Sequence, residues 1–242
     1  LGWGTTLGVV VLSLPLIVPA MATGWRWRPA LRMPADDARR IGTLAGAGII
    51  ALLAQQGAVL TTMWLAKQSG DLGTFTVYTY AQAVYLLPYA VLAVPVATSA
   101  FPALAARTGA GEDVTPTLGR SLRAVLVLTG LSVGVLIAAA PAIGAFFSLL
   151  DARRGDGATS TAALAALPGT LTAYAPGLVG FGLTALLTRA LYVRGKPTDA
   201  ALAAAIGWSI AALLPLAVLG GGQEPAVALR WLGLSSTLGM TV

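Results

Sequence analysis

The stretch LRAVLVLTGLSVGVLIAAAPAIGAFFSLL, residues 122–150, decides the fold class of this chain. Its single charged residue is Arg123, and every residue after Arg123 in the stretch is uncharged. A helix that spans a bilayer needs about 20 mostly apolar residues. An Arg at the bilayer centre costs roughly 2.5–3.5 kcal/mol, whereas a Leu or Val contributes only about −0.3 to −0.6 kcal/mol. The stretch is therefore predicted to be a membrane-spanning helix with Arg123 at its edge.

The same pattern recurs along the whole chain. All 15 Lys and Arg residues and all 9 Asp and Glu residues lie in or beside short connectors between apolar stretches. Strand edges would find no hydrogen-bond partners in lipid, so apolar runs of this length are expected to be helices. The sequence thus predicts an all-α fold, a polytopic transmembrane helical bundle. Six stretches are long enough to span and a seventh ends with the chain, at residues 4–23, 41–66, 75–104, 122–150, 162–192, 200–220 and 226–242.

Composition agrees with this fold class and excludes several functions. The chain is 57% hydrophobic and 10% charged, with a mean hydropathy of +0.81, whereas soluble domains are about 25% charged. Cysteine and histidine are absent, which excludes disulfides, thiol chemistry and His/Cys metal sites. No predicted span contains a carboxylate, so no catalytic site, metal site or cofactor is expected, and an enzyme is disfavoured.

The net charge of +6 does not indicate a nucleic-acid partner, because the cations flank apolar spans rather than form a basic run. Their expected partners are the anionic lipids of the inner leaflet. Alternate connectors hold 11 and 4 of the 15 cations, and the positive-inside rule places the richer set in the cytoplasm. That set is Arg26, Arg28, Arg32, Arg39, Arg40, Arg107, Arg120, Arg123, Arg189, Arg194 and Lys196.

Polar residues at membrane depth are the candidates for function. Gln55, Gln56 and Thr61 lie near the middle of the second span, where they either join helices through hydrogen bonds or line a cavity. Adjacent residues point about 100° apart, so the two glutamines cannot face one partner. Glycine pairs at four-residue spacing, such as Gly130 and Gly134, favour close approach of helices.

The third span carries a second group of candidates. Tyr78, Gln82 and Tyr85 share one helix face, which either binds sugar or peptide groups or belongs to an interfacial aromatic belt. Three prolines at seven-residue spacing lie on one face and are expected to kink the helix, either beside a cavity or in plain packing; they are Pro88, Pro95 and Pro102.

Three stretches of the sequence carry a family resemblance. Residues 73–107 read GTFTVYTYAQAVYLLPYAVLAVPVATSAFPALAAR and resemble the MurJ/MviN lipid II flippases, of actinobacterial type. Residues 174–196 (YAPGLVGFGLTALLTRALYVRGK) resemble the tenth helix of that family, and residues 1–19 resemble its sixth helix. Because neither end of the chain lies outside an apolar stretch, the chain is interpreted as an internal fragment.

The resemblance implies a fold of the multidrug/oligosaccharidyl-lipid/polysaccharide exporter superfamily, with two six-helix lobes. Residues 1–23 would be the last helix of the first lobe, residues 24–40 a cytoplasmic interfacial linker, and residues 41–242 most of the second lobe. The implied function is the movement of lipid II from the inner to the outer leaflet of the plasma membrane by alternating access. The implied partners are lipid II and membrane lipids, with cell-wall synthesis proteins as further candidates.

Two departures from the family and two alternative functions remain at this point. Many members carry an Asp-Arg pair where this chain has Gln82 and Ala83, and some bind sodium through carboxylates that no span of this chain contains. The alternatives are an exporter of another polyprenyl-linked glycan or of a drug, and a membrane scaffold for cell-wall synthesis.

Overall fold

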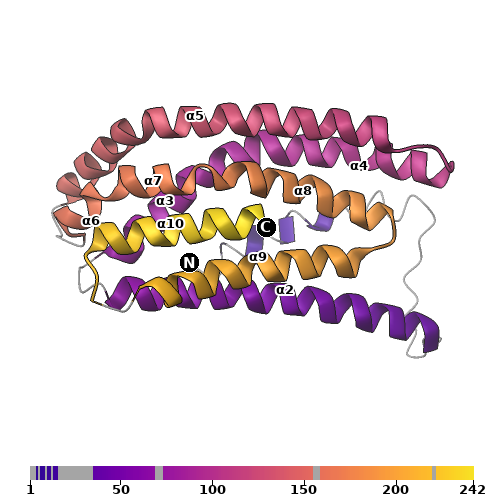
Figure 1. The fold of residues 1–242 in the computed structure, drawn as a ribbon, viewed down its shortest axis with the longest axis horizontal. Coiled ribbons are helices and arrows are strands. Elements are labelled where there is room, and N and C mark those ends of the chain that lie inside the picture. Colours follow the sequence, from indigo (N-terminus) through magenta and orange to yellow (C-terminus); the bar gives the residue numbers. More distant parts are fainter. Residues whose placement is uncertain are drawn as a thin grey trace. The chain divides into compact units, whose positions relative to one another are not determined.

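The computed structural model describes residues 4, 6–8, 10–11, 13–15, 35–68, 73–154, 159–219 and 222–242. The chain divides into two compact units, Leu1–Ile41 and Gly42–Val242. In the first unit, the described residues between 4 and 15 are helical. The second unit is a bundle of helices (Figure 1). No strand occurs among the described residues, and the predicted all-α fold class is confirmed.

Successive long helices of the bundle run in alternating directions (Figure 1). The described elements are α2 (Ala35–Gln68), α3 (Thr74–Pro88), the π-helix η1 (Tyr89–Ala93), α4 (Val94–Gly109), α5 (Thr115–Arg154), α6 (Thr161–Ala165), α7 (Leu167–Tyr174), α8 (Gly177–Val193), α9 (Pro197–Val218) and α10 (Pro225–Thr241). Arg39 and Arg40 fall within α2, whereas Arg26, Arg28 and Arg32 lie outside the described residues.

Four of the described helical runs are long and apolar enough to cross a bilayer, namely Ile41–Gln68, Thr74–Gly109, Thr115–Arg153 and Pro197–Val218. They overlap the predicted spans at residues 41–66, 75–104, 122–150 and 200–220. The predicted span at residues 162–192 is not one straight helix, because α7 and α8 meet at a bend of 41°. The last helix, α10, has 17 residues.

The π-helix η1 interrupts the run from Thr74 to Gly109 between two of the three prolines. Pro88 ends α3, and the amide of Val94 donates to the carbonyl of Tyr89, five residues back. A proline has no amide hydrogen to continue the α-helical ladder, which makes such a rearrangement favourable beside it. The ribbon changes direction between α3 and α4 (Figure 1). The π-helical segment therefore lies between Pro88 and Pro95, whereas Pro102 lies farther along, within α4.

The bundle buries small and aliphatic side chains between helices and exposes many large apolar ones. Tyr85, Leu171 and Leu232 belong to the main buried cluster, which joins α3, α5, α7 and α10. Large apolar side chains that lie on the outer surface include Leu60, Val127 and Leu213. An apolar outer surface of this kind is stable in contact with lipid tails and unstable in water.

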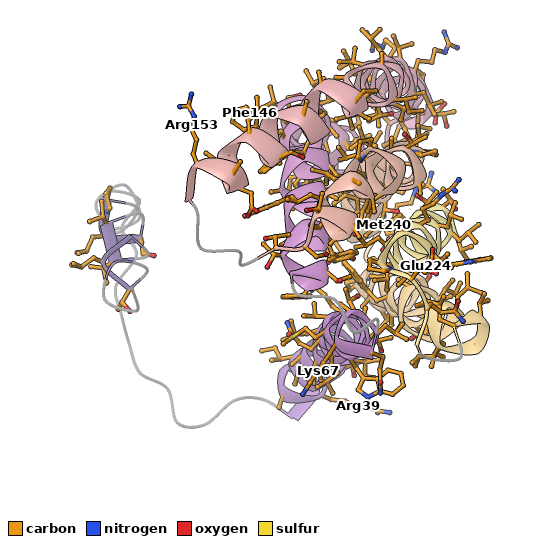
Figure 2. The ribbon with its side chains drawn as sticks, turned by 90° about the vertical axis from the view of Figure 1, so that its left-hand side faces the viewer. Arg39, Lys67, Phe146, Arg153, Glu224 and Met240 are labelled. Atoms are coloured by element: carbon orange, nitrogen blue, oxygen red, sulfur yellow. The ribbon has the colours of Figure 1, made fainter. Side chains whose placement is uncertain are left out.

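The two ends of the bundle carry different connectors (Figure 1). One end holds the α4–α5 and α8–α9 connectors, and Arg194 lies close enough to Asp113 for its charge to act on that carboxyl group. The other end holds the end of α2 and of α5, where Lys67 and Arg153 are exposed. Figure 2 shows the side chain of Arg153 projecting away from the helices. The helix directions therefore place Arg107 and Arg153 at opposite ends.

Candidate functional site

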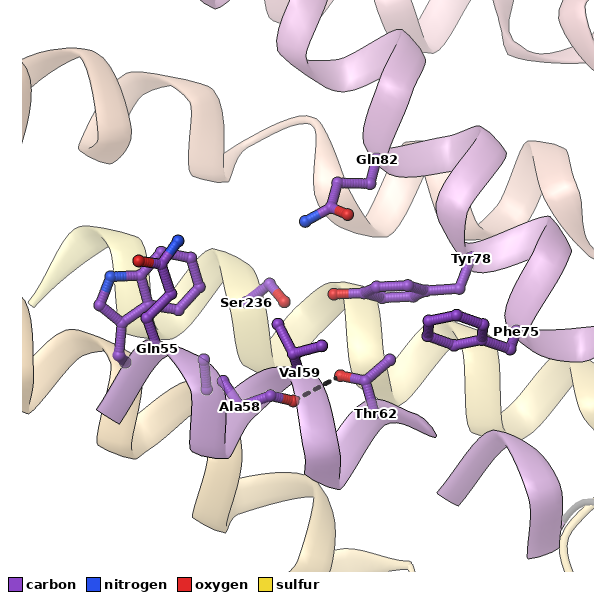
Figure 3. Close-up of a pocket in the computed structure, with 10 residues that line it drawn as sticks. Gln55, Ala58, Val59, Thr62, Phe75, Tyr78, Gln82 and Ser236 are labelled. Atoms are coloured by element: carbon purple, nitrogen blue, oxygen red, sulfur yellow. Dashed lines mark hydrogen bonds between the residues drawn. The ribbon is translucent and has the colours of Figure 1, made fainter. Parts of the chain in front are cut away.

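A cavity of about 70 Å³, lined by both polar and apolar side chains, lies inside the second unit, between α2, α3, α9 and α10 (Figure 3). A buried water occupies about 10–15 Å³ of such space, so the cavity has room for roughly five waters. Pockets that bind drug-sized ligands measure about 300–1,000 Å³, so a disaccharide does not fit in this conformation. The cavity is lined by Gln55, Ala58, Val59, Thr62, Phe75, Tyr78, Gln82, Trp208, Ala211 and Ser236.

Three of the six predicted cavity residues, Gln55, Tyr78 and Gln82, meet at this cavity. Gln55 comes from α2 and the other two from α3, and the side chains of Tyr78 and Gln82 both point toward the cavity (Figure 3). Gln56 is exposed and does not line the cavity. On α2, Thr62 lines the cavity and Thr61 does not.

Tyr85, the sixth predicted residue, lies in the buried core rather than at the cavity. Its ring packs edge-on against Tyr174 of α7, with ring centres 4.6 Å apart. Among the described residues its hydroxyl has no hydrogen-bond partner. Tyr78 reaches the same tyrosine from the cavity side, and the hydroxyls of Tyr78 and Tyr174 are 2.9 Å apart. Both side chains are buried inside the bundle, which disfavours an aromatic belt at the membrane surface.

The break between α7 and α8 lies directly beside Tyr174. Pro176 lacks an amide hydrogen, so the α-helical ladder cannot continue through it. The hydroxyl of Thr237 on α10 donates to the carbonyl oxygens of Ala173 at 2.7 Å and Tyr174 at 3.1 Å. Backbone groups freed at membrane depth need such partners. Broken helices of this kind are common at the binding sites of transporters.

Helices α9 and α10 approach closely at a pair of glycines and thereby fix two cavity residues. A Cβ atom on Gly207 would lie 2.4 Å from the carbonyl oxygen of Gly239, so neither position accepts a side chain without movement of the backbone. Trp208 follows Gly207 on α9, and Ser236 lies one turn before Gly239 on α10. Both cavity residues therefore belong to a pair of tightly packed helices.

The α2 wall of the cavity is held more loosely. Ala58 is its buried contact to α9, where it packs against Ala211 and Ala212 with Trp208 beside them. The hydroxyl of Thr62 donates to the carbonyl oxygen of Ala58 at 2.9 Å, within α2 itself. Only 6% of the apolar window of α2 is buried, against 28% for that of α9. Leu65, nearer the end of α2, is buried in the main cluster, so the low cost in buried area applies to the small alanine contact with α9 and not to the whole of α2.

The chemistry of the cavity is that of neutral hydrogen bonding. It offers the amides of Gln55 and Gln82 and the hydroxyls of Tyr78 and Ser236. In the described part of the chain, no three His, Cys, Asp or Glu side chains gather to hold a metal ion. Amides and hydroxyls both donate and accept hydrogen bonds, so they suit water, sugar hydroxyls and peptide groups.

A protein-family model described as "Lipid II flippase MurJ" matches residues 1–241 of the chain. The chain belongs to the MurJ lipid II flippase family. Members of the MurJ family move lipid II, so the chain is a transporter and not an enzyme, and its place is the plasma membrane, which it crosses several times. No curated protein and no solved structure matches the chain. The MurJ resemblance of residues 73–107 and 174–196 is thereby confirmed.

Several residues of the site were not predicted from the sequence. Trp208 and Ser236 lie in apolar stretches where nothing in the local pattern distinguishes them from core residues. The helix break had a local signal, because the run Ala175-Pro176-Gly177 joins two residue types that interrupt helices. The bond from Thr237 to that break joins residues far apart in the sequence, and helical periodicity does not show such contacts.

Proposed function

We propose that the cavity between α2, α3, α9 and α10 is part of the hydrophilic surface that the lipid II head group passes during flipping. The observation that carries the proposal is the meeting of Gln55, Tyr78 and Gln82 at membrane depth in a bundle whose outer surface is apolar. The head group of lipid II is a disaccharide with a peptide, and amides and hydroxyls hydrogen-bond both. The cavity has room for a few waters and not for a disaccharide, so the head group requires a wider conformation.

The small contact between α2 and α9 supports a widening of the cavity within the second lobe during alternating access. In this mechanism two lobes rock around a central site that opens to one side of the membrane at a time. Movement of α2 away from α9 would break the contact of Ala58 with Ala211 and Ala212 and open the cavity. The rigid side of the cavity, α9 and α10, would stay in place because of the close contact of Gly207 with Gly239.

The division into lobes is part of the same proposal. Residues 1–23 supply the last helix of the first lobe, residues 24–40 the linker, and residues 41–242 the second-lobe bundle. The unit Gly42–Val242 supports this division, because it packs as one compact body. A complete translocation path in this proposal requires both lobes. The direction of transport is from the inner to the outer leaflet.

The glutamines at 55 and 56 offer a matched test. Gln55→Leu removes an amide from the cavity, whereas Gln56→Leu changes an exposed side chain on the same helix. Loss of one hydrogen bond to the head group costs about 1 kcal/mol, or roughly a fivefold change in rate. We expect Gln55→Leu and Gln82→Leu to slow flipping by the full-length protein in liposomes by that factor or more, and Gln56→Leu to leave it unchanged. Equal rates for all three variants would refute the proposal.

A further inference from the structure

A second hollow lies between α4 and α5, toward the end of the bundle that holds their connector. It is an open groove of about 490 Å³. Arg107, near the end of α4, and Arg120, in the second turn of α5, lie at its connector end. The other lining residues are small or carry hydroxyl groups, and they are Val96, Ser99, Ala100, Ala103, Thr117, Ser121 and Ala124.

The two arginines keep most of their donors for a ligand. Arg107 donates to the backbone carbonyl of Asp113 at 3.2 Å and lies 3.7 Å from the carboxylate of Glu112. Arg120 donates from Nε to the carbonyl of Pro116 at 3.4 Å. A guanidinium group has five N–H donors, so these contacts occupy a minority of them. The ion pair with Glu112 is exposed on both sides and is therefore weak, so a ligand can replace it.

The carboxylate of Asp113, in the same connector as Glu112, is engaged by Thr115. The carboxylate of Asp113 accepts hydrogen bonds from the hydroxyl of Thr115 at 2.6 Å and from its amide at 2.9 Å. The hydroxyl of Thr115, with smaller contributions from the charges of Arg107 and Arg194, lowers the pKa of Asp113. These hydrogen bonds fix Asp113 just before Thr115, the first residue of α5. The guanidinium of Arg120 has no acidic partner among the described side chains.

The groove also has a place for a hydrocarbon chain. From Arg107 to Val96 it follows α4 for about 16 Å, at 1.5 Å per residue. Ala100, Ala103 and Ala124 leave space along it that longer side chains would fill. Ala100 forms the floor of the groove, because it is buried in a cluster with Leu104, Val125 and Leu186 of α8. Ala103 is exposed, so the groove is open to lipid on its outer side.

We propose that this groove binds one anionic glycerophospholipid, with its phosphate between Arg107 and Arg120 and an acyl chain along Ala100, Ala103 and Ala124. Basic pockets at the cytoplasmic ends of membrane helices bind anionic head groups. Arginine binds phosphate oxygens through paired N–H donors, and the hydroxyls of Ser121 and Thr117 add further donors. The distribution of cations along the chain places this end of the bundle at the inner leaflet. The bound lipid is a fixed component of the transporter and not its cargo.

The test is native mass spectrometry of the purified full-length protein in detergent with added phosphatidylglycerol. Each surface cation contributes about 1 kcal/mol to the binding of an anionic lipid. The double variant Arg107→Gln/Arg120→Gln is therefore expected to bind phosphatidylglycerol about 30-fold more weakly. The control is Arg153→Gln, which removes an exposed cation at the opposite end of the bundle and should change nothing. A second variant, Ala103→Trp, keeps both arginines and fills the chain-binding part of the groove, so it too should weaken binding.

Three comparisons separate this lipid from other phosphate compounds. Phosphatidylcholine at the same concentration should bind weakly, because its head group has no net charge. Millimolar inorganic phosphate should not displace the lipid, and its doing so would overturn the proposal in favour of a soluble anion. Displacement by an equimolar amount of undecaprenyl diphosphate would overturn it in favour of a substrate site. If the double variant and Arg153→Gln bind phosphatidylglycerol equally well, the lipid does not bind in the groove and the proposal is wrong.

Discussion

Two buried tyrosines of α3 differ in what their hydroxyls contact. The hydroxyl of Tyr78 meets that of Tyr174, whereas that of Tyr85 has no partner among the described residues. Tyr78→Phe removes one hydrogen bond from the Tyr174 hydroxyl, which keeps Ser236 as a partner, so the expected cost is about 0.5–1.5 kcal/mol, whereas removal of an unpaired hydroxyl is close to neutral or stabilising. We therefore expect Tyr78→Phe to lower the unfolding temperature of the purified protein in detergent and Tyr85→Phe to leave it unchanged or raise it.

Both variants keep the aromatic ring, so the packing of Tyr85 against Tyr174 remains and the comparison isolates the hydroxyl groups. An unfolding temperature lowered more by Tyr85→Phe than by Tyr78→Phe would contradict the described arrangement. The sequence predicts that both tyrosines lie on one helix face, but it does not predict that they contact Tyr174. Tyr174 belongs to another helix and lies 96 residues after Tyr78 in the chain. Periodicity shows which residues share a face and does not show what that face contacts.

At the scale of elements, the break between α7 and α8 depends on one hydroxyl from a third helix. Thr237 donates to the carbonyls of Ala173 and Tyr174, which the interrupted ladder leaves available. Thr237→Val keeps the shape of the side chain and removes the donor, so we expect a loss of about 1–3 kcal/mol in stability. Thr237→Ser keeps the hydroxyl and is expected to retain most of that stability. The measurement is unfolding in detergent, and equal losses in the two variants would indicate that packing, not the hydrogen bond, matters there.

The close approach of α9 and α10 provides another prediction at this scale. A Cβ atom at Gly207 would lie 2.4 Å from the backbone of α10, whereas one at Gly130 would meet nothing within 4 Å. Overpacking of this kind costs about 1–3 kcal/mol, while alanine in an exposed helix position is up to about 1 kcal/mol better than glycine. Gly207→Ala should therefore lower the unfolding temperature and Gly130→Ala should not. A loss in Gly130→Ala equal to that in Gly207→Ala would contradict the described packing.

The same glycines show what the sequence predicts about elements. Length and hydropathy were enough to predict four of the long helical runs, because the cost of a charge in lipid fixes where a span can begin and end. The spacing of Gly130 and Gly134 suggested a contact surface, yet both positions are open in the described bundle. Gly207 and Gly239 meet across two helices, and a four-residue spacing within one helix does not predict such a pair. Close packing between helices is a property of the fold and not of a local motif.

At the scale of the whole molecule, the charge distribution and the helix directions together predict an orientation. The richer set of cations, 11 of 15, falls in alternate connectors. Arg107 and Arg153 lie near the ends of α4 and α5, which run in opposite directions (Figure 1), so they lie at opposite ends of the bundle. The chain contains no cysteine, so single cysteines can report each end without interference. Ala110 in the α4–α5 connector and Ala152 near the end of α5 are both exposed and suit this purpose.

We expect a membrane-impermeant maleimide to label Ala152→Cys in intact cells and to label Ala110→Cys only after the membrane is permeabilised. The physical reason is that a translocated cationic connector opposes the positive-inside preference, whereas the connector after α5 carries fewer cations. The same experiment bears on the lipid groove, because Arg107 and Arg120 flank the connector that contains Ala110. Labelling of Ala110→Cys from outside would show that the bundle has the opposite orientation. The groove would then lie at the outer leaflet, and the proposal of an inner-leaflet phospholipid would be wrong.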